Sequence, residues 1–210
     1  MLRVIITILK YFLIVLLPFL SLIRGAVYLH VNYNPGPFLA VIGGVFFAFV
    51  ILMIYITILN YFFTDRIGGI SAFKWRAMFS MLLVLGYCSF CLFYISDDNL
   101  KHKSLSKELR SVHPIMRLAI GTWSILDKDL IITDANRQPE DYRKMGLPTN
   151  SKSLHILQKD GYAYALDLRT KNQSELRNMI LISYCKIMGL RTLRHTGTAD
   201  HLHISLHCHY

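Results

Sequence analysis

The residues best suited to chemistry lie near the C-terminal end of the chain, in the segment 200–209 (DHLHISLHCH). Polar and apolar residues alternate strictly there, which predicts a β-strand over His201–His207. Because successive side chains of a strand point to opposite faces, the polar residues share one face. That face carries His201, His203, Ser205 and His207. Histidines at this spacing beside Asp200 favour a metal or catalytic site over simple packing, although His207 and His209 are also compatible with a solvated tail.

A catalytic zinc site with an open position needs three protein ligands, typically His and carboxylate side chains. One strand supplies one or two of them, so the others must come from elsewhere. The best candidates are His155 and Asp167, in the stretch 153–170 (SLHILQKDGYAYALDLRT). On a strand over Gly161–Leu168, Asp167 shares a face with two alanines, which leave room for a metal and a substrate. A surface charge ending the strand is the alternative for Asp167, but leucines flank it on both sides.

The order of these motifs resembles the zinc D-Ala-D-Ala metallopeptidases, a group that includes D,D-carboxypeptidases, vancomycin-resistance dipeptidases, phage endolysin peptidases and the hedgehog-like metal fold. The family pattern is a strand leading to an Arg, a Ser-x-His, a small-x-small-x-Asp, a helix ending in Gly, and an acid-x-x-His closing strand. The matching segments here are 131–137 (IITDANR), 153–155 (SLH), 163–167 (AYALD), 188–190 (MGL) and 200–203 (DHLH). No segment is specific alone, but together, in the family's order, they cover nearly all of residues 113–210.

The resemblance implies a role for each matched residue. His155, Asp167 and His203 would ligate Zn²⁺, and Asp200 would be the general base that takes a proton from the attacking water. Arg137 would bind the carboxylate of the substrate or steady the developing oxyanion, for which a planar bidentate donor is well suited.

Two further roles follow from the same resemblance. Ser153 would lie near the substrate carboxylate, and His201 would donate to the transition state. The implied function is a zinc metallopeptidase, of carboxypeptidase or endopeptidase type, that hydrolyses a peptide bond in the stem peptide of peptidoglycan. D-Ala-D-Ala, L-Ala-D-Glu and cross-bridge bonds are all candidate substrates.

The sequence departs from the family pattern at two positions. The spacing between His155 and Asp167 is about five residues longer than usual, which we interpret as an insertion around Ile156–Asp160, because a loop absorbs extra residues without moving its ends. Asp160 is the alternative ligand, but it lacks the strand context. Asp134 stands where the family often has Ser.

The elements expected around these residues predict an α+β domain with a small antiparallel sheet and a zinc site. We expect a membrane domain over 1–95, a polar linker over 96–112 and the peptidase domain over 113–210. The expected elements are a helix over His113–Ile125, a strand over Leu130–Thr133, a short helix or turn over Pro139–Met145, a strand over Gly161–Leu168, a helix opened by Asn172 and closed by Gly189, and the final strand.

Three long apolar runs precede Asp97, over Val4–Ile23, Phe38–Phe63 and Ala77–Ile95. Each has about the 20 residues that a helix needs to cross the hydrocarbon core of a bilayer. A cleavable signal peptide is the alternative for the first run, but no small-x-small cleavage site follows it. We therefore expect three transmembrane helices.

Positive charge in the short loops sets the expected orientation. Arg3 and Lys10 mark the N-terminus, and Arg66, Lys74 and Arg76 mark the second loop, as cytoplasmic. The C-terminal domain should then lie on the extracytoplasmic, periplasmic side of a bacterial inner membrane. The chain carries a net charge of +10, and residues 97–210 hold 17 Lys/Arg against 12 Asp/Glu, a mildly basic balance that suits an anionic polymer such as the cell wall. No Lys/Arg run interleaved with aromatics is present, so no nucleic acid is expected as a partner.

Other function classes remain open at this level. A zinc-binding module that has lost hydrolysis would keep the ligands, whereas a metal-buffering membrane protein would use the His-rich tail to bind several ions. A transporter is disfavoured because the apolar runs hold no acidic residue. Cys88 and Cys91 are expected to pack inside the third run, while a disulfide between Cys185 and Cys208 is compatible with an oxidising compartment.

Overall fold

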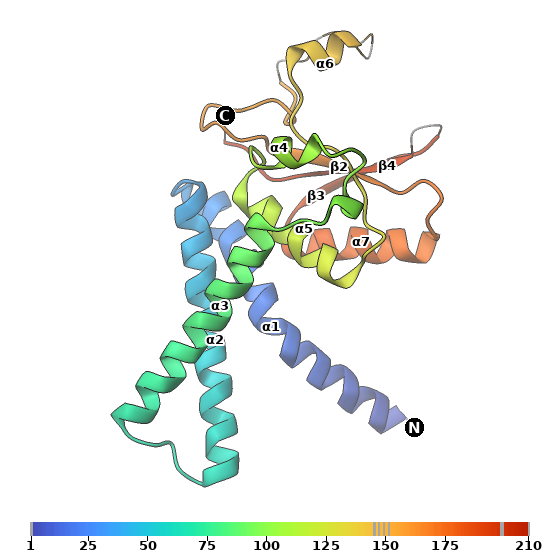
Figure 1. Cartoon of the computed structure of the whole chain (residues 1–210). Coiled ribbons are helices and arrows are strands. Elements are labelled where there is room, and N and C mark those ends of the chain that lie inside the picture. Colours follow the sequence, from blue (N-terminus) through green and yellow to red (C-terminus); the bar gives the residue numbers. More distant parts are fainter. Residues whose placement is uncertain are drawn as a thin grey trace.

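The computed structural model describes residues 2–144, 146, 148, 150, 152–197 and 200–209, with the side chains of residues 2–6, 8–15, 139 and 144 left aside. Three long helices precede an α+β domain (Figure 1). The elements are α1 (Leu2–Tyr33), α2 (Pro37–Thr64), α3 (Ile70–Phe93), the 3₁₀ helix η1 (Asp97–Asn99), α4 (Leu105–Leu109), α5 (Pro114–Leu126), β1 (Ile132–Asp134), α6 (Pro139–Lys144), β2 (Ala165–Arg169), α7 (Glu175–Met188), β3 (Arg191–His195) and β4 (His201–Ser205).

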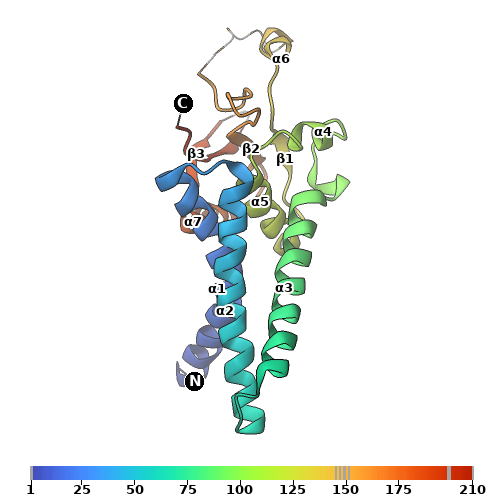
Figure 2. The ribbon, with the colours of Figure 1, turned by 90° about the vertical axis from the view of Figure 1, so that its left-hand side faces the viewer.

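Two helices, α2 and α3, are long and apolar enough to cross a membrane, judged by length and composition alone. They lie side by side below the α+β domain (Figure 2). Many of their large apolar side chains are exposed, including Phe46, Phe62 and Leu82 at 61%, 76% and 62%. Such a surface suits lipid, because a helix satisfies its backbone hydrogen bonds internally and can leave apolar side chains facing the bilayer.

Three spanning helices were expected, but among the described residues only two helices are long and apolar enough to cross a membrane. The remaining expected span, the N-terminal run Val4–Ile23, lies in α1, where most of its side chains are outside the described residues. At the described end of that run, protein rather than lipid surrounds the helix, since Leu22 and Ile23 are 1% and 0% exposed. Helix α2 approaches so closely that a Cβ on Gly44 would lie 2.2 Å from the carbonyl oxygen of Leu22.

The sheet has four strands in the order β1-β2-β4-β3, and every neighbouring pair is antiparallel. This confirms the predicted α+β domain with a small antiparallel sheet. Strand β4 lies between β2 and β3, with Asp167 opposite His203 and Leu193 also opposite His203. Strand β3 was not predicted, because its residues alternate between exposed and half-buried and form no apolar face.

One face of the sheet forms the core of the domain. Leu166, Leu168, Leu202 and Ile204 are all 0% exposed and belong to one apolar cluster with residues of α5 and α7. Helices α5 and α7 lie on that side, and the loop that carries α6 rises on the other (Figure 1). Because side chains alternate along a strand, Asp167 and His203 point away from the core, toward the loop.

The segment expected as a linker is built into the domain. It contains η1 and α4, and Leu105, Leu109 and Val112 are 1%, 7% and 0% exposed. Leu100 and Val112 also form isolated bridges with Ile132 and Ala163. The α+β domain therefore includes the chain from about the end of α3 onward.

The ends of α7 follow capping chemistry. Gly189 closes the helix in the left-handed conformation with φ of 89°, as predicted, and its N–H donates to the carbonyl of Cys185. At the start, Ser174 rather than Asn172 is the N-cap, because the Ser174 side chain accepts from the N–H of Arg177.

Helix α5 packs tightly against α3, since a Cβ on Gly121 would lie 2.4 Å from the carbonyl oxygen of Cys91.

Candidate metal centre

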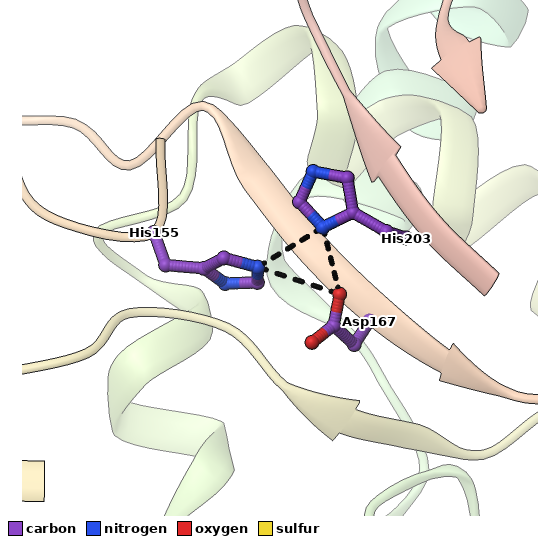
Figure 3. A group of neighbouring side chains, drawn as sticks. All are labelled: His155, Asp167 and His203. Carbon is purple, nitrogen blue, oxygen red and sulfur yellow. Dashed lines mark hydrogen bonds and ion pairs between the residues drawn. The ribbon is translucent and has the colours of Figure 1, made fainter. Parts of the chain in front are cut away.

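Three side chains that are far apart in the sequence converge beside the sheet: His155, Asp167 and His203 (Figure 3). Nε2 of His155 lies 3.2 Å from Nδ1 of His203 and 3.3 Å from Oδ1 of Asp167. Nδ1 of His203 lies 2.9 Å from the same carboxylate oxygen. All three potential ligand atoms are within 4.8 Å of one another. Among the described residues, these three form the group of His, Cys, Asp or Glu side chains that could hold a metal ion.

The sheet register positions two of the three side chains. Asp167 of β2 and His203 of β4 are directly opposite in the antiparallel pair, so both point to the same face. His155 comes from the preceding loop, which is tied back to the sheet by the hydrogen bond from the N–H of Tyr164 to the carbonyl of Leu154 at 2.7 Å. Its Nδ1 bonds to the carbonyl of Ala135 at 2.9 Å, and therefore carries the proton in the neutral ring. The lone pair of Nε2 is left facing Asp167 and His203.

The additional residues between His155 and Asp167 form a turn that does not disturb the group. The N–H of Gln158 donates to the carbonyl of Tyr162 at 2.9 Å, which closes the turn around Asp160. Asp160 accepts from the hydroxyl of Tyr164 at 2.7 Å and from the N–H of Tyr162 at 3.2 Å. The structure thus brings Asp167, and not the alternative Asp160, to the two histidines.

Arg137 balances the charge of the group. Its Nη2 donates to Oδ2 of Asp167 at 3.0 Å, and its Nε donates to Oδ2 of Asp134 at 2.5 Å. Burial alone would raise the pKa of Asp167, but its contacts with the rings of His155 and His203 outweigh burial and hold the pKa well below the usual value. Asp167 is therefore ionised at neutral pH, with Oδ1 turned to the histidines and Oδ2 to Arg137.

The spacing of the donors fits a small divalent ion. Bonds of about 2.0–2.1 Å in a tetrahedral zinc site separate neighbouring ligand atoms by about 3.3 Å. The three separations here are 2.9, 3.2 and 3.3 Å, close to that edge length. Two imidazoles and one carboxylate suit zinc and neighbouring transition metals, whereas magnesium and calcium favour oxygen ligands throughout. The backbone bond to His155 is also the kind of support that orients metal-ligating histidines.

Solvent reaches the group from one side. The side chains of His155 and Asp167 are 4% and 5% exposed, whereas that of His203 is 24% exposed. His201, two residues before His203, is exposed to 28% and its Nε2 lies 3.8 Å from Oδ2 of Asp167. Its ring stacks on that of His195 in β3, with centroids 4.8 Å apart and an interplanar angle of 22°. His201 therefore lies beside the group, on its accessible side.

Asp200, the predicted general base, is held elsewhere. Its Oδ1 accepts from the hydroxyl of Thr170 at 2.6 Å, and its Oδ2 accepts from Nη2 of Arg194 at 2.9 Å. Arg194 is opposite Leu202, on the core side of β4 and away from His203. Gly197 has φ of 125°, as a turn requires, but Thr198 and Ala199 lie outside the described residues. The structure brings Asp200 together with Arg194 and Thr170 rather than with the metal group.

Ser153 supports the loop that holds His155. Its hydroxyl oxygen accepts from the N–H of His155 at 3.3 Å, and its carbonyl accepts from the side chain of Gln158 at 3.2 Å. Both contacts fix the backbone at the point where His155 leaves the loop. Among these residues, Arg137 contacts Asp167 directly, whereas Ser153 contacts the backbone of the loop that carries His155.

The last histidines of the chain do not join this group. The carbonyl of His207 accepts from Nε2 of His30 in α1 at 2.9 Å, and Nε2 of His209 donates to the carbonyl of His30 at 2.9 Å. They attach the C-terminal tail to the first helix. The four cysteines are free thiols, so Cys185 and Cys208 are not paired, and burial raises the pKa of Cys185 to about 12.

Sequence reasoning missed two partners of the candidate site residues. Asp134 was noted only as a departure from the family pattern, yet it clamps Nε of Arg137, and its spacing of three residues from Arg137 was a usable signal. Arg194 was not singled out at all, because nothing in its local sequence indicates that β3 brings it to Asp200.

No protein-family model, curated protein or solved structure matches this chain. The assignment of function therefore depends on the side chains themselves, above all on the three converging donors and the arginine beside them.

Proposed function

We propose that this protein is a zinc-dependent peptidase that is held in a bacterial inner membrane and hydrolyses a peptide bond of peptidoglycan on the extracytoplasmic side. The observation that carries the proposal is the convergence of His155, Asp167 and His203 at tetrahedral edge distances, with one accessible side. Catalytic zinc sites use three protein ligands of this kind and leave one position for the reaction.

A zinc ion in this group would supply a Lewis acid that polarises the scissile carbonyl and lowers the pKa of the attacking water. The chain contributes the rest. Arg137, fixed by Asp134 and Asp167, offers its remaining N–H groups to a substrate carboxylate or to the developing oxyanion. His201 lies on the accessible side, where it can accept a proton from the attacking water and return it to the leaving amine.

The cell-wall substrate is supported by features outside the metal group. Helices α2 and α3 suit a membrane, and positive charge in the loop between them favours a cytoplasmic position for that loop. The α+β domain then lies on the opposite side of the membrane. Its excess of Lys and Arg suits an anionic polymer, and the motif order resembles peptidases that act on peptidoglycan.

The test uses the full-length protein in detergent, incubated with purified peptidoglycan, with the released fragments identified by mass spectrometry. We expect fragments from the wild type, none after treatment with a zinc chelator, and recovery after zinc is added back. Asp167→Asn should release none, whereas His102→Ala, a change at an exposed histidine in the segment before α4, should behave as the wild type. Chelator-resistant release, or no release from zinc-loaded protein, would contradict the proposal.

A zinc-binding module without hydrolysis is the second candidate, and one observation favours it. Asp200, the acid of the acid-x-x-His motif, is bound to Arg194 and Thr170 and is not directed to the metal group. Such a module would bind zinc and sediment with peptidoglycan but release no fragments. If the same incubation is then sedimented and the protein in the pellet is measured, it separates the two candidates, because retention and cleavage are read on one sample.

A further inference from the structure

A cavity of about 440 Å³ lies where the chain leaves the second apolar helix and enters the α+β domain. Its lining comes from the end of α3 and the residues after it, from α4 and the residue that follows, from α5, and from Leu166 of β2. This volume is within the range of pockets that bind small ligands, about 300–1,000 Å³. The cavity is thus large enough for a compact polar group with part of an apolar chain.

The charge of the cavity is entirely positive among the residues that line it. Four lining side chains can ionise, namely Cys91, Tyr94, Arg110 and Arg117, and the two arginines carry the positive charge. Neither arginine has an ion pair among the described residues. Arg117 donates one N–H to the carbonyl of Leu92, and its guanidinium lies 5.8 Å from the ring centroid of Phe93. Burial and the neighbouring charge of Arg110 lower the pKa of Arg117. Two cations that disfavour each other make an anion the natural ligand.

The position of the cavity points to the kind of anion. Phe93 and Tyr94 at the end of α3 are 79% and 55% exposed, and Phe90 stacks on Tyr94 with ring centroids 4.9 Å apart. Exposed aromatic rings at the end of an apolar helix mark the boundary between hydrocarbon and water. A guanidinium binds the oxygens of a phosphate through parallel N–H donors, and Arg at this level meets lipid headgroups.

We propose that Arg110 and Arg117 bind the phosphate of an anionic glycerophospholipid in the leaflet next to the α+β domain. The acyl chains of this lipid lie along the exposed apolar side chains of α3, and the headgroup enters the cavity. The contact fixes how the domain stands on the membrane surface. It depends on α2 and α3 crossing the bilayer, but not on the metal group.

The cavity and the metal group are on opposite faces of the sheet. Leu166 lines the cavity and the next residue, Asp167, belongs to the metal group, and consecutive side chains of a strand point to opposite faces. A lipid bound here is therefore separate from the peptidase substrate. Removing the lipid site should leave zinc binding unchanged, so failure of one proposal does not mean failure of the other.

The test titrates phosphatidylglycerol into the full-length protein in neutral detergent and counts bound lipid by native mass spectrometry. Arg110 is exposed, so Arg110→Glu reverses a cavity charge without disturbing the core. Arg143→Glu in α6 is the matched control, since Arg143 has a 73% exposed side chain and does not line the cavity. Phosphatidylcholine tests the need for an anion, and inorganic phosphate as a competitor tests whether a soluble anion would suffice.

We expect one retained phosphatidylglycerol for the wild type and for Arg143→Glu, and an apparent Kd about tenfold or more weaker for Arg110→Glu, the size expected for losing a charge-assisted contact. Phosphatidylcholine should not be retained, and millimolar phosphate should not displace the lipid. Equal binding by the two variants, equal retention of phosphatidylcholine, or full displacement by phosphate would each overturn the proposal.

Discussion

Asp167 and Asp200 are both carboxylates beside β4 that accept hydrogen bonds from an arginine, but their surroundings differ in the remaining partners. Asp167 shares one oxygen with the ring nitrogens of His155 and His203. Asp200 accepts hydrogen bonds from the guanidinium of Arg194 and the hydroxyl of Thr170, and in these contacts both groups act as donors. A divalent ion needs several lone pairs that converge on one point. The first carboxylate is set in such a group, whereas the second is surrounded by hydrogen-bond donors.

This difference shows that the spacing of a motif does not by itself determine the role of its acid. Asp200 and His203 have the spacing of the acid-x-x-His motif, yet the strand that follows α7 provides Arg194, which holds the acid on the core side. Glu175 at the first turn of α7 also binds Arg194, with contacts of 2.5 and 2.8 Å, and completes the clamp. Asp200 therefore links β3, β4 and α7, while Asp167 links the loop of His155 to β4.

The largest expected effect is on metal binding. Asp167→Asn should weaken zinc affinity by about 100-fold or more, because it removes a charged ligand while keeping the shape of the side chain. Asp200→Asn should leave the affinity within a few fold of the wild type. Competition with a chromophoric chelator measures both constants on the full-length protein. Equal losses in the two variants would break the distinction between the two carboxylates.

The next effect is on catalysis. His201→Ala should lower the rate of peptide hydrolysis by about 10²–10⁴-fold and keep zinc, because it removes the proton-transfer group on the accessible side. Asp200→Asn should keep most of the activity under the same conditions. Rates on a defined muropeptide, measured with the metal content of each sample, give the comparison. If Asp200→Asn keeps its zinc but loses activity like His201→Ala, the acid must leave Arg194 and act as the base.

A moderate effect is expected on stability, and it should depend on pH. Asp200 has a side-chain exposure of 17%, and its contacts with Arg194 and Thr170 hold its pKa at about 2, below its usual value. A lowered pKa means that the folded state binds the proton less readily, so the stabilisation is present above about pH 4 and is lost as the pH falls toward 2. Arg194→Ala should cost about 1–2 kcal/mol at pH 7.

Thermal unfolding of wild type and Arg194→Ala, followed by intrinsic fluorescence in detergent from pH 7 to pH 2, measures this dependence. The gap between the two melting temperatures should narrow as the pH falls from about 4 toward 2, where Asp200 becomes protonated. The exposed ion pair Arg143–Glu140 supplies the control, and Arg143→Ala should change stability by less than about 0.5 kcal/mol. A gap that stays constant across the range would mean that Arg194 stabilises the fold without Asp200.

The smallest effect is expected at Ser153. Ser153→Ala removes the acceptor of the N–H of His155 and should cost about 0.5–1 kcal/mol of stability, with only a few-fold loss of zinc affinity. The backbone bond of the His155 ring to Ala135 remains and keeps the ligand oriented. Zinc titration and thermal unfolding of the variant test this. A loss as large as that of Asp167→Asn would make Ser153 part of the metal group itself.

Much of the fold was predictable because its signals are local. The apolar periodicity of α5, the Gly189 cap of α7 and the alternation of β4 each depend on a few neighbouring residues. Strand β3 was not predictable, because its partners lie in β4 and its own residues have no apolar face. The polar sequence before α5 predicts a linker rather than short helices, because the burial of this segment depends on contacts with β1 and with the loop before β2.

The candidate site was predictable in part for the same reason. His203 followed from strand periodicity, and the motif order pointed to His155, Asp167 and Arg137. The pairing of Asp167 with His203 depends on the register of β2 and β4, which sequence spacing does not determine. The clamp on Asp200 was not predictable, because it needs Arg194 from an unpredicted strand and Thr170, the residue after β2.

The central claim is that His155, Asp167 and His203 hold one catalytic metal ion. X-ray absorption at the zinc edge, on full-length protein loaded with one equivalent of zinc, tests it most directly. We expect one tightly bound ion with two imidazole nitrogens and further oxygen or nitrogen ligands at about 2.0–2.1 Å. In His203→Ala the spectrum should lose one imidazole and the ion should dissociate readily. A sulfur-rich shell, three or more imidazoles, or unchanged binding in His203→Ala would contradict the account.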